Sequence, residues 1–435
     1  MRYVNLFAIL LFVIFSTGKE SLAQVTGKRY VNLAHLDHLY RTVKLANGTE
    51  AGTIAIYSEA PDFHLVTDAD EGFTCVDDVS RAALLLLNEP DLATNTDKQT
   101  KLRALTEFVL QLQAEDGDRG AGYFSNFLWP DGSINKTFKT SVAEPNFWSW
   151  RAMWHLTHVY TYYQKTDRIL AGRIQTATQK LIVVMLRDFL GKPKAFKRVR
   201  GVRVPDWLPF GSGSDQAAIM LLSLLAIHQQ TPNADLLKLI DLLGEGIIAM
   251  QYGGPGQYPY GAILSYENTW HAYASDQAYA LLRVGKALNK PAWQAAARRE
   301  IDNFYPYLLK QGLLESFVVE QTGNGIKAVS TNRFSQIAYS VRPMIWAALE
   351  AYDQTKNTKY ADMAAQFTGW FLGKNPAGVV MYDRTTGRGY DGIGTSAVVN
   401  RNSGAESTIE SLWAFQRLEQ YPEVLNKLKD ERVKK

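Results

Sequence analysis

Six strongly apolar segments of this chain each follow a polar or charged opening, and the openings recur at a near-constant interval. Their marker positions are Asp78, Trp148, Asp215, Asp276, Arg342 and Glu406, with the longest step from Asp78 to Trp148 and the shortest from Asp215 to Asp276. An interval of that size accommodates two helices and two loops, so the repeating unit is a helical hairpin. The pattern therefore predicts six hairpins, whose first helices begin near residues 77, 147, 214, 275, 338 and 404.

The two helices of each predicted hairpin differ in their hydrophobic pattern. The first is apolar nearly all round, as in residues 217–222, which is typical of a helix buried on every side. The second is amphipathic, and in residues 234–251 the apolar positions form one stripe at spacings of three and four. Similar stretches lie near 99–114, 170–189, 291–310 and 358–373, with a short one after Tyr421. One buried and one half-buried helix per unit favours a double-walled ring, an all-α (α/α)6 toroid, over an open solenoid.

The segment that precedes the first hairpin departs from this pattern. Residues 1–23 combine a basic start, an apolar run and small residues before a cut after Ala23, which predicts a secretory signal peptide and an exported protein, periplasmic or extracellular. The apolar run is shorter than the roughly 20 residues that span a membrane. Residues 24–70 are expected to pack on the ring as an extension, with an amphipathic helix over 28–45 and a strand or strand pair over 51–67. The toroid itself is predicted over 71–435.

Composition narrows the classes of function. Cys75 is the only cysteine, which excludes an internal disulfide and a thiolate-rich metal site. The seven histidines show no metal-ligand spacing, so neither a metal nor a cofactor is expected. The formal net charge of +4 falls to +3 when Arg2, Lys19 and Glu20 leave with the signal peptide, and no dense basic run predicts nucleic-acid binding. We expect a monomer without a membrane-inserted segment after signal cleavage.

Long loops are predicted mainly before the first helix of each hairpin, over 116–145, 190–213, 252–274, 311–338 and 374–403. They carry much of the glycine and proline and many aromatic residues, whereas the connections on the other rim are short. Long loops on one face of a fold usually mark its functional face. The sequence therefore predicts a site at the mouth formed by the N-terminal ends of the inner helices.

Five of the six openings place an acidic side chain at this mouth, and the fifth hairpin offers Arg342 instead. The acids are Asp77 and Asp78, Glu144, Asp215, Asp276 and Glu406. Helix N-termini favour carboxylates, and both Ser403-Gly-Ala-Glu406 and Ser141-Val-Ala-Glu144 match the helix capping box. Capping and catalysis therefore both remain open for any single acid. The convergence of these acids in one aromatic-lined bowl favours a catalytic role for them.

A bowl with several carboxylates, aromatic platforms and no metal ligands suits a carbohydrate. Hydrolysis of a glycosidic bond needs one carboxylic acid for the leaving oxygen and a second carboxylate, roughly 6.5–9.5 Å away when it activates water. Ring closure places the first and sixth inner helices side by side, at a typical interaxial distance of about 8–10 Å. We therefore predict an inverting glycoside hydrolase with Glu406 as general acid and Asp78 as base. Asp77 is the alternate, because consecutive helical residues point about 100° apart.

The remaining candidates for sugar binding have two roles open to them. Stacking on a sugar and packing between loops are both open for Trp148, Trp150, Tyr258, Trp270 and His271. Arg342 could bind a substrate carboxylate or neutralise its acidic neighbours. Glu410 lies one turn beyond Glu406 and could tune that acid or stand as an ordinary core-edge residue. The predicted substrate-binding set is completed by Glu144, Asp215 and Asp276.

Two segments carry a resemblance to a known family, Phe73-Thr-Cys-Val-Asp-Asp-Val-Ser-Arg81 and Asn402-Ser-Gly-Ala-Glu-Ser-Thr-Ile-Glu410. Together with the hairpin repeat, they make residues 70–425 resemble the six-hairpin glycosidase superfamily, which implies an (α/α)6 toroid acting on carbohydrate. The second segment is similar to the family nine endoglucanases, in which an acid enters the last inner helix. It departs from them because their Asp-Ala-Gly-Asp base motif is absent and their acid lies further ahead of the helix. No numbered family is assigned.

Two other classes of function are open. A polysaccharide lyase or an epimerase acting on a uronate-containing glycan needs a tyrosine or histidine base and a group that neutralises the carboxylate. The chain offers Asn146, His271, Tyr339 and Arg342 for these roles. A non-catalytic glycan-binding protein of the cell envelope would instead show binding without turnover.

Overall fold

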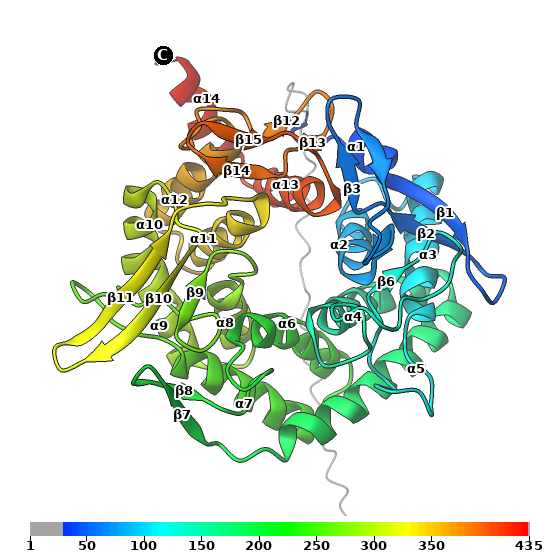
Figure 1. The fold of residues 1–435 in the computed structure, drawn as a ribbon, viewed down its shortest axis with the longest axis horizontal. Coiled ribbons are helices and arrows are strands. Elements are labelled where there is room, and N and C mark those ends of the chain that lie inside the picture. Colours follow the sequence, from blue (N-terminus) through cyan, green and yellow to red (C-terminus); the bar gives the residue numbers. More distant parts are fainter. Residues whose placement is uncertain (1–28, 434–435) are drawn as a thin grey trace, which may run out of the picture.

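The computed structural model describes residues 29–433, which form a ring of helices (Figure 1). Six inner helices follow one another around its centre: α2 (Val76–Leu87), α4 (Phe147–Thr166), α6 (Ser214–Gln230), α8 (Gln277–Ala287), α11 (Arg342–Thr355) and α13 (Ala405–Leu418). Each packs on the next, and α13 packs on α2, so the ring is closed. The predicted all-α (α/α)6 toroid is confirmed.

The outer wall consists of the amphipathic partners. They are α3 (Thr96–Gln111), α5 (Arg168–Met185), α7 (Ala234–Ala249), α9 (Pro291–Arg299) with α10 (Tyr305–Gln311), α12 (Thr358–Thr368) and α14 (Pro422–Val433). In α7, Asn233 caps the helix by accepting from the backbone N–H of Asp235 and Leu236 at 2.8 and 3.1 Å. Its apolar stripe, with Leu239 and Leu243 fully buried, packs on α6. Local capping and a one-sided stripe therefore suffice to place this helix in the wall.

Short antiparallel strand pairs order the loops that precede the inner helices. The pairs are β7 (Phe196–Val199) with β8 (Val202–Pro205), β10 (Ser316–Thr322) with β11 (Gly325–Asn332), β12 (Tyr382–Asp383) with β13 (Arg388–Gly389), and β14 (Gly392–Thr395) with β15 (Val398–Asn400). In addition, β9 (Thr269–His271) pairs with β10, and β5 (Thr74–Cys75) pairs with β6 (Phe127–Leu128). These pairings hold the loop residues in fixed positions beside the helix N-termini.

The N-terminal extension corrects one prediction. Helix α1 covers only Ala34–Leu39, and the strand β1 (Tyr40–Lys44) follows where the sequence predicted a helix to continue. β1 pairs with β2 (Glu50–Ile54) across a turn in which Gly48 has a φ of 84°. Tertiary pairing here overrides the local helical pattern. The predicted strand region also holds the pair β3 (Tyr57–Glu59) and β4 (His64–Val66), while the predicted signal peptide, 1–23, lies outside the described residues.

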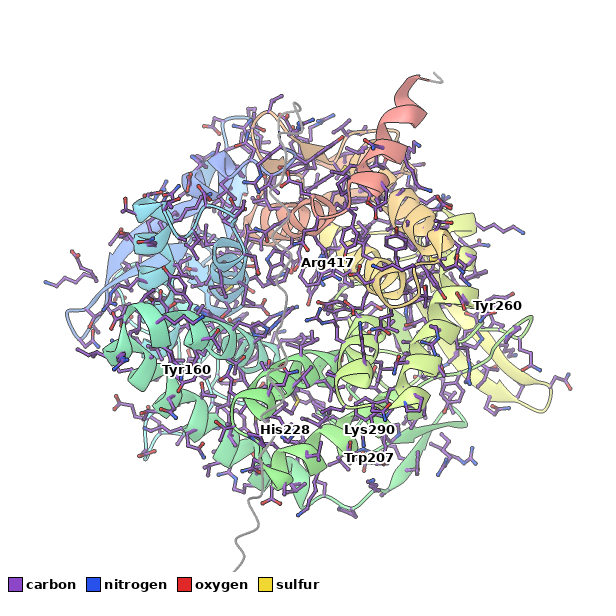
Figure 2. All side chains as sticks on the ribbon, turned by 180° about the vertical axis from the view of Figure 1, so that it is seen from behind. Tyr160, Trp207, His228, Tyr260, Lys290 and Arg417 are labelled. Carbon is purple, nitrogen blue, oxygen red and sulfur yellow. The ribbon has the colours of Figure 1, made fainter. Side chains whose placement is uncertain are left out.

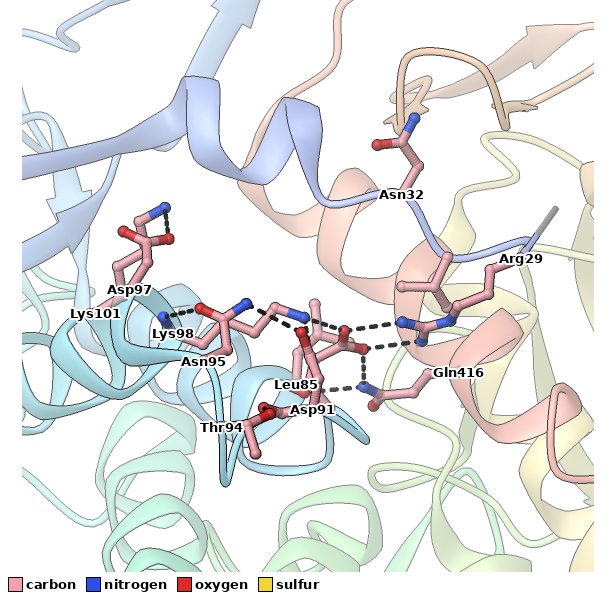
Figure 3. Close-up of polar contacts among 12 residues, drawn as sticks. Arg29, Asn32, Leu85, Asp91, Thr94, Asn95, Asp97, Lys98, Lys101 and Gln416 are labelled. Atoms are coloured by element: carbon pink, nitrogen blue, oxygen red, sulfur yellow. Dashed lines mark hydrogen bonds and ion pairs between the residues drawn. The ribbon is translucent and has the colours of Figure 1, made fainter. Parts of the chain in front are cut away.

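An ion-pair cluster joins the two ends of the ring (Figure 3). Arg29 donates to both carboxylate oxygens of Glu89 at 3.1 Å, and Lys98 donates to the same group at 2.7 Å. The side-chain amide of Gln416, on α13, adds a third donor at 2.9 Å. Burial opposes the ionisation of Glu89, but these donors hold its pKa below its usual value. The cluster connects the N-terminal segment, the first hairpin and the last inner helix.

Three tryptophans from the inner helices fill the centre of the ring. The ring centroids of Trp154, Trp346 and Trp413 lie 5.3 to 6.5 Å apart. Figure 2 shows the ring from behind, with Arg417 near its centre, where its guanidinium pairs with Glu350 at 3.0 Å. The guanidinium groups of Arg151 and Arg342 lie 4.8 to 5.4 Å from the centroids of these rings, so the tryptophans form an apolar layer beneath a buried polar cluster.

Candidate functional site

Asp77 and Asp78 lie at the start of α2 and differ in their access to solvent. The Sγ atom of Cys75 accepts from the backbone N–H of Asp78 at 3.4 Å, and its thiol contacts Asp78 Oδ2 at 3.2 Å. The Asp78 side chain is only 4 % exposed, whereas that of Asp77 is 22 % exposed. Of these two neighbours, Asp77 is the one that reaches the mouth.

Arg81, one turn further along α2, connects four carboxylates. Its Nε lies 2.9 Å from Asp77 Oδ1, and its Nη2 lies 2.7 Å from Asp78 Oδ1. The same guanidinium reaches α13, with Nη1 2.8 Å from Glu410 Oε1 and Nη2 3.4 Å from Glu406 Oε2. Ring closure therefore brings the acids of the first and last inner helices to one cation. Sequence reasoning missed this residue, although spacings of three and four from an acid are those of helical ion pairs.

The helix-capping alternative is not realised at Glu406. No side chain caps the start of α13, and the hydroxyl of Ser403 donates to a carbonyl of β13 at 2.8 Å instead. Glu144 precedes α4 and accepts a hydrogen bond at 2.8 Å from Asn146, which is itself the N-cap residue of that helix. Glu144 thus supports a helix start, whereas the carboxyl of Glu406 faces the guanidinium of α2.

Arg342, at the first position of α11, is fully buried between two carboxylates. Its Nε lies 2.6 Å from Glu410 Oε2, and its Nη2 lies 3.1 Å from Asp276 Oδ2. The side chains of all three residues have no exposed surface. Of the two roles open to Arg342, neutralising its acidic neighbours is the one the structure shows. Asp276 and Glu410 likewise lie beneath the floor of the mouth and support it.

A third buried guanidinium, that of Arg151 from α4, completes an arginine layer. The ring of Tyr339 lies over all three groups, with its centroid 5.1 Å from the Cζ of Arg81, 5.2 Å from that of Arg151 and 5.4 Å from that of Arg342. Arg151 Nε lies 3.6 Å from Asp77 Oδ1. From the mouth inward, the partly exposed carboxyls of Asp77 and Glu406 are therefore followed by the buried arginines and then by the tryptophans.

The carboxyl groups of this cluster differ in the direction in which their surroundings shift their pKa values. Burial raises the pKa of Glu406 to about 7, and the neighbouring carboxylates add to the rise while Arg81 opposes it. The Glu406 side chain nevertheless keeps 44 % of its surface exposed. Burial also raises the pKa of Asp78. Burial opposes the ionisation of Glu410 as well, but the three arginines hold its pKa below its usual value. Carboxyl groups whose pKa values are pushed apart are typical of acid–base sites.

Asp215 and His271 form a second polar cluster at the mouth. Asp215 Oδ2 lies 3.2 Å from His271 Nε2, and the other ring nitrogen, Nδ1, faces the carbonyl of Tyr273 at 3.0 Å. Both of these partners are hydrogen-bond acceptors. The imidazole ring also stacks on the phenol of Tyr273, with 3.9 Å between the ring centroids. Both nitrogens of His271 are therefore engaged.

The predicted aromatic platforms lie in the packed interior. The indole N–H groups of Trp148 and Trp150 donate to buried acceptors at 2.7 and 2.8 Å. Trp270 is fully buried and stacks on Phe317, against which the partly buried Tyr258 also packs. Burial favours the packing interpretation for these four residues. The aromatic side chain that is exposed beside the carboxylates, Tyr273, is not in the predicted set.

Comparison with known proteins identifies the fold. No protein-family model and no curated protein matches the sequence. A sugar epimerase from a ruminal bacterium matches with a TM-score of 0.62 at 9 % identity, over 89 % of this chain and 95 % of that chain. Cellobiose 2-epimerase from Bacillus thermoamylovorans matches with a TM-score of 0.59 at 10 % identity, over 90 % and 96 %. A family 76 glycoside hydrolase from a bovine Bacteroides thetaiotaomicron strain gives 0.55 at 12 % identity, over 91 % and 79 %.

These likenesses establish the class of fold that the closed ring defines. The chain has the (α/α)6 toroid that these proteins share, as its hairpin repeat predicted. The matched proteins are carbohydrate-active enzymes of different reaction types, epimerases as well as a hydrolase. Because one fold supports several reactions, the reaction has to be argued from the site. Among residues 29–433, no group of three or more His, Cys, Asp or Glu side chains is arranged to hold a metal ion.

Proposed function

We propose that this chain is a glycoside hydrolase acting on a poly- or oligosaccharide, with Glu406 as the general acid and Asp77 as the catalytic base. One observation carries the proposal. A partly exposed carboxyl with a pKa of about 7, and hence partly protonated near neutral pH, stands beside a second reachable carboxylate on the neighbouring inner helix. The carbohydrate-active enzymes that share the fold support the substrate class.

Asp77 is preferred to Asp78 as the base because a base has to contact the water that it activates. Asp78 is almost fully buried and is held by Cys75 and Arg81. It is better suited to position Arg81, which in turn orients the exposed carboxyls of Asp77 and Glu406. Attack by a water from the side opposite to the acid inverts the anomeric centre, and this is the stereochemistry we propose.

The charge balance of the floor suits this reaction. Five carboxyl groups (Asp77, Asp78, Asp276, Glu406 and Glu410) surround three guanidinium groups (Arg81, Arg151 and Arg342). Glycoside hydrolysis passes through an oxocarbenium-ion-like transition state, which carries positive charge on the sugar. With Glu406 protonated as the general acid, four carboxyl groups remain around the three cations, and carboxylates fixed in this way stabilise such charge without having to reorganise.

A lyase or an epimerase acting on a uronate-containing glycan is less well supported by the same geometry. Either reaction needs a free base and a cation available to the substrate carboxylate. Both ring nitrogens of His271 face acceptors, and Arg342 is buried between Asp276 and Glu410. Two of the four residues that the sequence offered for these roles, His271 and Arg342, are therefore already engaged within the protein, whereas the phenol oxygen of Tyr339 is buried without a hydrogen-bond partner among the described residues.

The test is a screen of plant, algal and microbial glycans with the wild-type protein, Glu406→Gln and Asp77→Asn, followed by mass and NMR analysis of the products. We expect hydrated products of inverted anomeric configuration, and a loss of turnover of about 10²–10⁴-fold in each variant. Asp206→Asn is a matched control, because this mouth-loop acid pairs only at 3.6 Å with the surface residue Lys197. Unsaturated products would indicate a lyase, and a full-length isomer an epimerase. Binding without any turnover would indicate a glycan-binding protein.

We also propose that the protein is exported, on the strength of the signal peptide that the sequence predicts over residues 1–23, and that the exported form is a monomer. Expression of the full chain in a Gram-negative host should yield a periplasmic or secreted form that begins at Gln24. Mass analysis of the intact protein and light scattering check these points. A cytoplasmic protein that retains the segment from Met1 to Ala23 would contradict the export proposal.

A further inference from the structure

Tyr273 is exposed at the mouth, whereas the tryptophans predicted as sugar platforms are buried. It lies between β9 and α8, and 40 % of its surface is exposed. Folding usually removes large aromatic rings from water, because burying them is favourable. An aromatic ring that stays exposed beside a carboxylate cluster is therefore a candidate contact for a ligand.

His271 holds the phenol ring of Tyr273 from one side. The two ring planes differ by 9°, with 3.9 Å between their centroids. His271 is fixed in turn by the carboxylate of Asp215 at 3.2 Å, by the Tyr273 carbonyl at 3.0 Å and through its backbone N–H, which donates to Ser265 Oγ at 3.1 Å. One face of the phenol is covered by this imidazole, so the opposite face is the one that a ligand can meet.

The position of Tyr273 places its ring near the reacting groups. Its ring centroid lies 6.4 Å from that of Tyr339, which covers the arginine layer. Burial, together with the charges of Asp215, Glu315 and Glu406, raises the pKa of Tyr273 to about 12. The hydroxyl thus stays protonated at neutral pH, lies within electrostatic reach of the proposed general acid, and is a hydrogen-bond donor rather than a base.

We propose that the outward face of Tyr273 stacks on the sugar ring beside the bond that is cleaved, and that the Asp215–His271 pair holds the phenol in place for this contact. The inference rests on the proposed function and deepens it by naming the surface that binds the apolar face of a pyranose. A ring held in advance by a stacked imidazole that is itself fixed by Asp215 loses little freedom on binding, which favours affinity.

The test measures sugar binding in a Glu406→Gln background, in which turnover does not consume the ligand. Isothermal titration calorimetry with cellohexaose, mannohexaose, xylohexaose and hexagalacturonate provides the probes. Adding Tyr273→Ala is expected to weaken binding of the best probe about tenfold, whereas Tyr273→Phe, which keeps the stacking face, stays within about threefold. Tyr266→Ala is the matched control. This residue is similarly exposed but lies among the surface charges Glu267 and Lys197, and its variant should bind like the parent.

A double-mutant cycle tests the supporting role of His271. If the imidazole acts by holding the phenol, His271→Ala weakens binding in the presence of Tyr273 and adds little once Tyr273 is alanine. Equal binding by the Tyr273→Ala and Tyr266→Ala proteins would overturn the proposal, as would a parent protein that binds none of the four probes. A Glu406→Gln protein with full turnover would instead overturn the catalytic assignment and leave the loss of binding in Tyr273→Ala to be judged separately.

Discussion

Replacing Arg81 by methionine removes the cation that the carboxylates of α2 and α13 share. Methionine retains an unbranched, flexible apolar side chain, so the change is mainly a loss of charge and hydrogen bonds. After the substitution, Glu410 keeps its ion pair with Arg342, whereas the buried carboxyl of Asp78 keeps only the thiol of Cys75. The variant therefore leaves the nearly buried carboxyl of Asp78 without a cationic partner.

The expected cost follows from this burial. Removing one partner of a buried ion pair costs roughly 3–5 kcal/mol in the free energy of unfolding, because the remaining charge is uncompensated. We expect a value near the lower end, about 3 kcal/mol, because Asp78 can take up a proton. Burial already raises its pKa, and Arg81 is the main group that opposes this rise. Since protonation removes the stranded charge, the penalty should be largest at neutral pH and should shrink as the pH falls.

Urea unfolding followed by tryptophan fluorescence at pH values of about 5 and 7.5 measures this effect. Arg173→Met is the matched control, since this half-exposed arginine of the outer wall pairs with Glu107 at 2.7 Å. Glu107 is largely buried but keeps Arg103 at 3.6 Å as a second partner, so we expect the loss of this half-exposed arginine to cost about 1 kcal/mol. If Arg81→Met were as stable as Arg173→Met at the higher pH, the shared role of Arg81 would be refuted. A penalty that is equal at both pH values would refute the part assigned to Asp78.

Three further predictions concern single side chains. Because the general acid must be protonated, kcat/KM of the wild-type protein should fall as the pH rises through about 7, the pKa to which burial raises Glu406; a profile that stays flat between pH values of about 6 and 9 would contradict this role. Burial raises the pKa of Glu300 to about 8, above its value in the unfolded chain, so this residue contributes stability at low pH that is lost as the pH rises from about 5 through 8. Glu300→Gln should flatten that part of the stability curve, as unfolding midpoints at both ends of the range would show. Trp270→Ala should cost about 3–5 kcal/mol in urea unfolding, whereas a loss below about 1 kcal/mol would argue against its place in the core.

Local pattern predicted most of the fold. A buried helix that alternates with a half-buried one, at a near-constant step along the chain, requires a double wall, and the structure has it. The same repeat by itself predicts that the acids Asp77, Asp78 and Glu406 lie close together. The helix predicted over residues 28–45 is wrong for residues 40–44, because their pairing with the strand β2 overrides the helical spacing of apolar residues.

The details of the site depended on contacts between distant parts of the chain. Arg81 meets Glu410 across 329 positions of sequence, and spacing along one helix does not show such a partner. The exposure of Asp77 rather than Asp78 is set by what lies around the start of α2. Trp270 and Tyr273 are near neighbours in the sequence, yet one is buried against Phe317 and the other faces the mouth.

The sequence by itself determined the number of hairpins, the closed ring and the face on which the acids gather, because these follow from hydrophobic periods that repeat along the chain. Only the tertiary structure decided which acid reaches solvent, which arginine links the carboxylates and which aromatic ring is open to a sugar. Burial, ion pairing and pKa are properties of the neighbours that folding brings together, and a neighbour from the far end of the chain leaves no periodic trace in the segment it contacts.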